Sequence, residues 1–288
     1  MFGFLNVYKP VGKTSHDVVA YFRKLLKIKK IGHTGTLDPF AEGVLPICVG
    51  NSTRLIEYLP DDKAYLAFVQ LGKATDSYDT EGNVIFESDK KVTKEQIVSA
   101  LTSFEGEIEQ LPPMYSAIKV KGKKLYEYAR EGKTISVAPR QVTIHKIELK
   151  NFDEEKQEAQ VYIECSKGTY IRSIANDLGQ NLCCGGYLTR LIRTKAGKFL
   201  VEDSIKMQDY KSIEFVEKHL IEPISMLNYP LYNLNTSEKL DISNGIPILN
   251  KSINNAENII LVYNDSIKAV ASSCNGCIKV KKVFNNDY

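Results

Sequence analysis

The spacing of apolar residues predicts alternating strands and helices over most of the chain. Residues 4–10 read as a short strand ended by a proline, and apolar positions three and four residues apart then predict a helix. Residues 63–72 alternate as a strand whose two faces are largely covered, and residues 93–96 form a capping box that opens another helix. Further strands are expected at residues 142–149 and 159–165. This mixture favours a mixed α/β (α+β) fold.

The pattern changes near residue 229, where short strands separated by asparagine and glycine turns take over. Three strands are expected in this part, at residues 259–263, 267–272 and 278–284. We therefore predict two domains, a large one of residues 1–229 and a small β-barrel unit of residues 230–288.

Residues 32–43 are rich in glycine and have neither a helical nor a strand period, which predicts a shaped loop. Asp38 lies inside it, directly before Pro39. A proline disfavours the α region for the residue before it, so the backbone of Asp38 is held extended and its carboxylate is restricted in direction. Such a side chain can be aimed at a substrate. The ordinary alternative is that Asp-Pro simply marks a turn.

Residues 167–179 combine a glycine turn with a helix for which Thr169 is the expected N-cap. Arg172 falls in the first turn of that helix, off its apolar stripe. An arginine in such a place is usually a surface residue. Because it follows a strand end, where α/β proteins commonly bind ligands, we expect it to have a carboxylate partner.

Positive charge is concentrated, although the net charge is only +3. Residues 116–146 contain eight basic and two acidic side chains, a balance of +6 that leaves −3 for the remainder. A second basic cluster precedes the glycine loop: Arg23, Lys24, Lys27, Lys29 and Lys30. Arg190, Arg193 and Lys195 add positive charge further along the chain. Charge runs are usually solvated faces, but two such clusters beside a candidate site indicate a polyanionic partner.

Several classes of protein do not fit the sequence. No apolar run approaches the roughly 20 residues that cross a bilayer, and no signal peptide opens the chain, so we expect a cytoplasmic protein. The segment Gly12-Lys-Thr14 resembles the end of a phosphate-binding P-loop, but Val7 stands where that motif needs its first glycine. Cys274 and Cys277 lack further ligands for zinc, so two thiols flanking a turn are expected.

Four motifs, in order along the chain, resemble one family. They are Lys9-Pro-Val-Gly-Lys-Thr-Ser15, the loop of residues 32–43, Leu111-Pro-Pro-Met-Tyr-Ser-Ala-Ile-Lys119 and Lys167-Gly-Thr-Tyr-Ile-Arg172. Together they resemble the bacterial TruB family of tRNA pseudouridine-55 synthases, with a likeness that covers about residues 4–199.

The resemblance implies a pseudouridine-synthase catalytic domain with a central mixed sheet and a basic, thumb-like insertion at about residues 110–145. A small PUA-like RNA-binding domain would follow. The implied activity converts a uridine of the tRNA T-loop to pseudouridine by flipping out the base, cleaving its glycosidic bond and reattaching the ring through C5. The resemblance also implies no cofactor, no metal and no guide RNA, with the tRNA T-arm as partner of an expected monomer.

By motif position, Asp38 matches the essential aspartate of the family, which acts on the sugar either as a nucleophile or as a base. Six more residues match positions that bind or surround the substrate: Lys9, His33, Tyr65, Tyr170, Arg172 and Leu188. Arg172 would pair with the aspartate and Tyr65 would stack on the target base. The pairing is physically sensible, because a guanidinium favours and orients an ionised carboxylate.

Two features keep other interpretations open. Glu42 stands in the glycine loop where the family commonly has a small residue or threonine, which adds a negative charge near a site for a polyanion. A protein that only binds and refolds tRNA would share the same basic segments. A subunit directed by guide RNA is a third possibility, but the long basic extensions expected of one are missing from this sequence.

Overall fold

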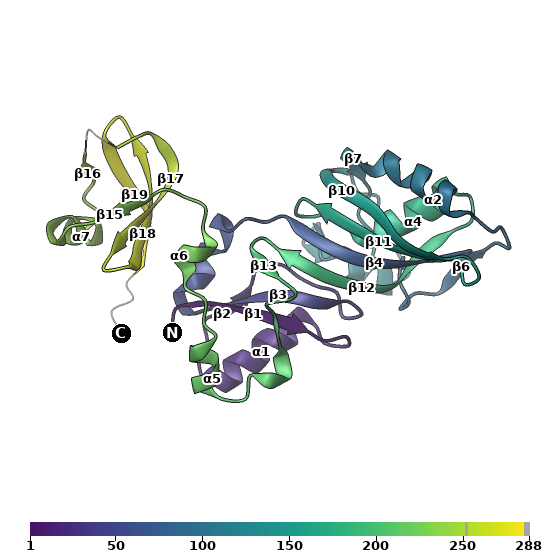
Figure 1. Ribbon diagram of the computed structural model, residues 1–288, viewed down its shortest axis with the longest axis horizontal. Helices are drawn as coiled ribbons and strands as arrows, with labels where there is room; N and C mark the ends of the chain where they lie inside the picture. Colours follow the sequence, from purple (N-terminus) through teal and green to yellow (C-terminus); the bar gives the residue numbers. More distant parts are fainter. Residues whose placement is uncertain (251–252, 285–288) are drawn as a thin grey trace.

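A computed structural model of the chain describes residues 1–250 and 253–284. Its largest element is a ten-stranded mixed sheet with the order β14-β1-β3-β12-β4-β11-β10-β7, to which β13 and β2 add at β12 and β3 (Figure 1). The strands are β1 (Gly3–Lys9), β2 (Ile31–His33), β3 (Glu42–Val49), β4 (Lys63–Leu71), β7 (Gly106–Gln110), β10 (Arg140–Asp153), β11 (Glu158–Cys165), β12 (Gly186–Ala196), β13 (Phe199–Leu200) and β14 (Ile205–Lys206). The predicted mixed α/β fold is confirmed.

Several helices lie against this sheet. They include α1 (Ser15–Leu26) beside β2, α2 (Lys94–Leu101) against β10, and α4 (Ile171–Asn181) against β12. The N-cap of α1 is Thr14 and that of α2 is Thr93, as the capping box of residues 93–96 predicted, and each cap is completed by the side chain three residues on.

The N-cap predicted for α4 was wrong. Its N-cap is Tyr170, because the hydroxyl of Thr169 donates to the carbonyl of Ser166 at 2.9 Å and is not turned toward the helix.

The centre of the sheet places three segments side by side. Strand β12 pairs in parallel with β3, where Arg193 lies opposite Gly43, and antiparallel with β4, where Arg193 lies opposite Tyr65. The glycine loop therefore leads directly into a strand that neighbours β12. Gly43 has a φ of +108°, and a Cβ at this position would lie 2.3 Å from the carbonyl oxygen of Arg193. Only glycine suits this close approach.

The basic insertion lies between β7 and β10. It contains the two-residue strands β8 (Lys119–Val120) and β9 (Lys123–Lys124) and a short helix, α3 (Leu125–Arg130). Leu125 is fully buried, whereas the tyrosine rings of this helix are half-buried beside cations. The ammonium of Lys123 lies 4.8 Å from the centre of the Tyr128 ring.

A second, five-stranded sheet forms the C-terminal part, with the order β15-β17-β18-β19-β16 (Figure 1). Its strands are β15 (Leu231–Asn233), β16 (Ile248–Leu249), β17 (Ala256–Tyr263), β18 (Ser266–Cys274) and β19 (Cys277–Val283), and α7 (Thr236–Ser243) lies beside β16 and β19. The three predicted strands are confirmed, although Phe284 lies outside β19. Cys274 and Cys277 face each other across the expected turn, and both are free thiols.

The two sheets share a hydrophobic core. Phe4 of β1 and Leu55 of the 3₁₀ helix η1 (Gly50–Tyr58) belong to the same buried cluster as Ile267 and Val270 of β18 and Phe284. Burial of these side chains stabilises the contact by about 1.5–3 kcal/mol each. The C-terminal sheet is therefore packed onto the large sheet and not merely tethered to it.

Polar contacts reinforce this junction. The guanidinium of Arg54 donates to the carbonyl of Val283 at 2.7 Å and lies over the ring of Phe284. Lys282 forms an ion pair with Glu57. Its charge is engaged within the protein.

In the part of the chain that the structure describes, no helix is long and apolar enough to cross a membrane.

Replacing Gly43 by alanine should destabilise the protein by about 2–4 kcal/mol, because it adds a strained positive φ to a backbone clash. Gly12 is the matched control: its φ is +79°, but a Cβ there would meet nothing within 4 Å. The Gly12→Ala variant should lose only about 1 kcal/mol. Urea unfolding of both variants checks this, and equal losses would contradict the role given to the close approach.

Candidate active site

The loop between β2 and β3 carries Asp38 and is tied to the beginning of α1. The N–H of Leu37 donates to the hydroxyl of Ser15 at 2.8 Å, and that hydroxyl donates back to the carbonyl of Leu37 at 3.1 Å. The N–H of Gly12 donates to the carbonyl of Pro39 at 2.8 Å. The residues on both sides of Asp38 are thus fixed to a neighbouring element.

Lys9 also anchors this loop, through hydrogen bonds to backbone carbonyls. Its ammonium donates to the carbonyls of Lys13 at 2.6 Å, Pro10 at 3.0 Å and Pro39 at 3.4 Å, and the residue is fully buried. Burial lowers the pKa of Lys9 to about 8, partly opposed by the charge of Asp38. Lys9 therefore contacts the loop from the interior of the protein, and its predicted place beside the substrate stays a prediction.

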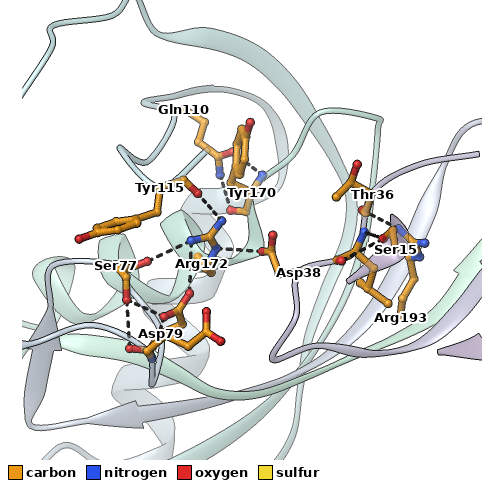
Figure 2. Close-up of polar contacts among 12 residues, drawn as sticks. Ser15, Thr36, Asp38, Ser77, Asp79, Gln110, Tyr115, Tyr170, Arg172 and Arg193 are labelled. Carbon is orange, nitrogen blue, oxygen red and sulfur yellow. Dashed lines mark hydrogen bonds and ion pairs between the residues drawn. The ribbon is translucent and has the colours of Figure 1, made fainter. Parts of the chain in front are cut away.

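Asp38 forms an ion pair with Arg172, whose Nε lies 3.1 Å from the Asp38 Oδ2 (Figure 2). The Arg172 side chain is only 6% exposed, whereas that of Asp38 is 36% exposed. The N–H of Nε is not aligned on the oxygen and has no other hydrogen-bond partner in the described chain, so the contact is ionic. The predicted carboxylate partner of Arg172 is confirmed, and one face of that carboxylate is open to solvent.

Two further segments hold the guanidinium of Arg172. Its Nη1 lies 3.2 Å from the Asp79 Oδ2 and donates to the carbonyl of Ser77 at 3.3 Å, and its Nη2 donates to the carbonyl of Tyr115 at 2.9 Å. Asp79 is itself oriented by the Ser77 hydroxyl at 2.5 Å and the N–H of Glu81 at 3.0 Å. Arg172 therefore lies between two carboxylates, as Figure 2 shows.

Sequence reasoning missed Asp79. A signal was present: Thr75, Ser77 and Asp79 alternate along the chain, and all three are buried. Such alternation indicates that one face of the segment is polar and buried. The sequence does not show that this face contacts Arg172.

Gln110, the last residue before the insertion, fixes the start of α4. Gln110 accepts from the N–H of Tyr170 at 2.7 Å and donates to the Tyr170 carbonyl at 3.0 Å. This backbone clamp places Tyr170 and Arg172 at the mouth of the insertion, next to Tyr115. The Tyr170 side chain is half-buried, and its predicted contact with substrate stays a prediction.

Tyr65 and Leu188 lie on the adjacent strands β4 and β12. Tyr65 is 7% exposed, and burial raises the pKa of its phenol to about 12, an effect that the charge of Arg193 opposes. Leu188 is fully buried, and its N–H donates to the carbonyl of Tyr78 in the turn that carries Asp79. Their proposed contacts with the target base stay predictions.

His33 ends β2, just before the loop. Its Nδ1 accepts from the N–H of Gly35 at 3.2 Å, which places the ring proton on Nε2. Burial lowers the pKa of His33, and the charges of Arg193 and His16 add to this effect. The ring is therefore a neutral Nε2–H donor at neutral pH.

Two charges near the loop differ from expectation. Glu42 does not add an uncompensated negative charge, because Arg190 contacts its Oε1 through Nε at 2.7 Å and Nη2 at 2.6 Å, and the Tyr8 hydroxyl donates to its Oε2 at 2.8 Å. Arg193, expected to add positive charge for a polyanion, is fully buried. Its charge serves the interior of the protein.

The family model described as TruB family pseudouridylate synthase (N terminal domain) matches residues 23–171, the part that contains Asp38 and Asp79 and ends directly before Arg172. The chain belongs to the TruB family. It is 46% identical over 255 residues to tRNA pseudouridine synthase B of Clostridium kluyveri, covering 88% of this chain and 87% of that protein. It is 43% identical to tRNA pseudouridine synthase B of Carboxydothermus hydrogenoformans, with 99% of each chain covered.

Solved structures agree with membership of the TruB family. A chain in the crystal structure of a Cbf5-Nop10-Gar1 complex has a TM-score of 0.73 and 25% identity, over 98% of this chain and 84% of that one. A chain in an H/ACA RNP bound to a substrate RNA containing 2′-deoxyuridine has a TM-score of 0.71 at 24% identity, over 98% of this chain and 85% of that one. This second likeness is one of fold.

Asp79→Asn should lower turnover by about 10²-fold. The amide fills the same space, but Arg172 loses one of its two carboxylate partners and shifts relative to Asp38. Asp76→Asn is the control, since Asp76 lies in the same turn and accepts hydrogen bonds from Asn83. Single-turnover rates of pseudouridine formation at saturating tRNA provide the measurement. A rate for Asp79→Asn equal to that of the control would remove Asp79 from the site.

Turnover should also fall as the pH rises through about 8, where Lys9 loses its proton. A neutral amine has two N–H donors for three carbonyls, so the loop beside Asp38 loosens. The folded-state pKa of Lys9 lies below the usual 10.5, so the folded protein binds fewer protons between these values than the unfolded chain. The contribution of Lys9 to the free energy of unfolding therefore increases as pH rises. The loss of turnover above about pH 8 is thus not caused by unfolding.

Rate measurements between about pH 6.5 and 9.5, together with urea unfolding at each pH, test this behaviour. Lys9→Met should be slow at every pH and should lack the decline near pH 8. A decline that persists unchanged in Lys9→Met would assign it to another group.

Proposed function

We propose that this chain is a tRNA pseudouridine synthase with Asp38 as its catalytic residue. It isomerises uridine to pseudouridine in tRNA, the activity named for its close relatives in the TruB family. The observation that carries the catalytic assignment is the ion pair between the half-exposed Asp38 and the buried Arg172. The loop holds a carboxylate open to solvent on one face and fixed by a guanidinium on the other.

The finer assignment is uridine 55 in the T-loop, bound as part of the T-arm by a monomer that needs no guide RNA. Residues 1–229 form the catalytic domain in this assignment, and residues 230–288, of which 251–252 and 285–288 lie outside the described residues, form the PUA-like RNA-binding domain. The basic insertion supports it, because lysines beside half-buried tyrosines suit a phosphate backbone with unstacked bases.

The reaction moves one bond and one proton. The uridine leaves its stack at a cost of a few kcal/mol, which the aromatic and basic groups of the site offset. The bond between C1′ and N1 breaks, the ring turns, a bond forms between C1′ and C5, and the hydrogen of C5 is replaced by one on N1. Asp38 acts on the sugar, as a nucleophile or as a base. Arg172 keeps its carboxylate ionised and directed.

The other residues support the base and the loop. Tyr65 presents an un-ionised phenol at neutral pH, because its pKa is about 12, and its ring would stack on the extruded base. Leu188 backs this position on the neighbouring strand, and His33 offers an Nε2–H donor at the edge of the loop. Tyr170, fixed through its backbone, lies at the entrance from the insertion.

Asp38→Asn should lower the rate of pseudouridine formation by more than about 10³-fold, because an amide can neither attack nor accept the proton, while the dissociation constant for the RNA changes little. Release of tritium from a T-arm stem-loop labelled at C5 of uridine gives the rate. The same RNA with cytidine at position 55 is the substrate control. Turnover retained by Asp38→Asn would reject the catalytic assignment.

An RNA chaperone that binds and refolds tRNA is the competing function, and the same basic segments would serve it. Multiple turnovers separate the two, because a chaperone leaves every uridine intact. Activity on a tRNA transcript with no added RNA tests the absence of a guide.

A further inference from the structure

Arg193 is the largest side chain of the described residues that is fully buried. A buried cation is costly unless it is paired and hydrogen-bonded. No ion pair of the described residues includes Arg193, since the carboxylates near the loop pair with Arg172 and Arg190. A charged group in this position therefore needs another explanation than a salt bridge.

The guanidinium donates to backbone carbonyls on both sides of Asp38, and it also contacts the phenol of Tyr65. Its Nη2 donates to Gly35 at 3.1 Å and its Nη1 to Thr36 at 3.2 Å, both before Asp38 in the chain. Its Nε donates to Val44 at 2.7 Å, just after the loop has entered β3. One planar group thus joins the two ends of the loop.

The backbone of the same residue joins the flanking strands. Arg193 lies opposite Gly43 of β3 and opposite Tyr65 of β4. Gly35 also lies close to the guanidinium, since a Cβ at this position would lie 4.0 Å from the Arg193 Nη1. The loop, the strand that follows it and the strand of Tyr65 therefore meet at one arginine.

We propose that Arg193 is a positioning residue, whose guanidinium fixes both ends of the catalytic loop and so keeps Asp38 at its distance from Arg172. This rests on the proposed function of Asp38. Asp38 and Arg172 belong to separate elements, the loop after β2 and the helix α4, so their contact depends on how firmly the loop is anchored. A misplacement of about 1 Å at a catalytic group can cost about 10²-fold in rate.

The chemistry of arginine suits this role better than that of other residues. A lysine would keep the charge, but all its donors sit on one nitrogen, whereas the Arg193 guanidinium reaches the three carbonyls from three separate nitrogens of a rigid plane. A methionine of similar length would avoid the desolvation of a charge and would leave the three carbonyls without their donors. Retention of the loop geometry, and not of charge alone, is the property to test.

The experiment compares Arg193→Lys and Arg193→Met with the wild type. Lys198→Met is the matched control, because Lys198 lies on the hairpin between β12 and β13 and its ammonium also donates to backbone carbonyls, those of Ser225 and Leu227. Single-turnover rates of pseudouridine formation at saturating T-arm RNA, dissociation constants for that RNA and thermal unfolding are measured well below the unfolding temperature of each variant.

Both Arg193 variants should lose about 10–10²-fold in single-turnover rate while folded, with dissociation constants for the RNA within about threefold of wild type. Lys198→Met should keep the wild-type rate. If Arg193→Met does not fold, Arg193→Lys decides the question.

Two results would overturn the proposal. A wild-type rate in folded Arg193→Lys would show that the fork is not needed, and weaker RNA binding with an unchanged saturated rate would make Arg193 an RNA-binding residue. Failure of the proposed function is distinct from both, because the wild-type protein itself would then form no pseudouridine.

Discussion

The site depends on the burial of one guanidinium, that of Arg172. A cation placed in the interior must be matched by charges and acceptors, or the folded state bears a desolvation cost of several kcal/mol. The partners of Arg172 come from three segments far apart in the chain: the loop of Asp38, the turn of Asp79 and the base of the insertion at Tyr115. Folding around this arginine therefore brings the carboxylate, the turn and the insertion together.

The other buried cations are satisfied in a different way. Lys9 and Arg193 contact backbone carbonyls of the loop and its flanks, and neither takes the carboxylate of Asp38. Asp38 thus keeps Arg172 as its one ionic partner in the described chain, with the remaining side open. Lys9 and Arg193 fix the backbone of the loop, and Arg172 orients the carboxylate of Asp38.

Local features were predictable from the sequence, and non-local ones were not. The capping box at Thr93 depends on residues three positions apart, and it occurs where expected. Pairing of Asp38 with Arg172 was reached through the proline constraint and the family resemblance. Asp79 was missed because its importance lies in the arginine it meets, 93 residues away. Arg193 was taken for a surface charge, since a buried and an exposed arginine look alike in a basic stretch.

The junction between the two sheets limits how RNA can be held. Phe284 is fully buried in a cluster shared with Phe4, and Lys282 is engaged by Glu57, so the end of β19 is part of the packing against η1. A flexible linker would let the small sheet sample many positions, whereas this apolar junction fixes it against Phe4 and Leu55 of the large domain. Any RNA contact made by the small sheet therefore acts at a set distance from Asp38, and it aligns the bound RNA with the catalytic loop as well as adding affinity.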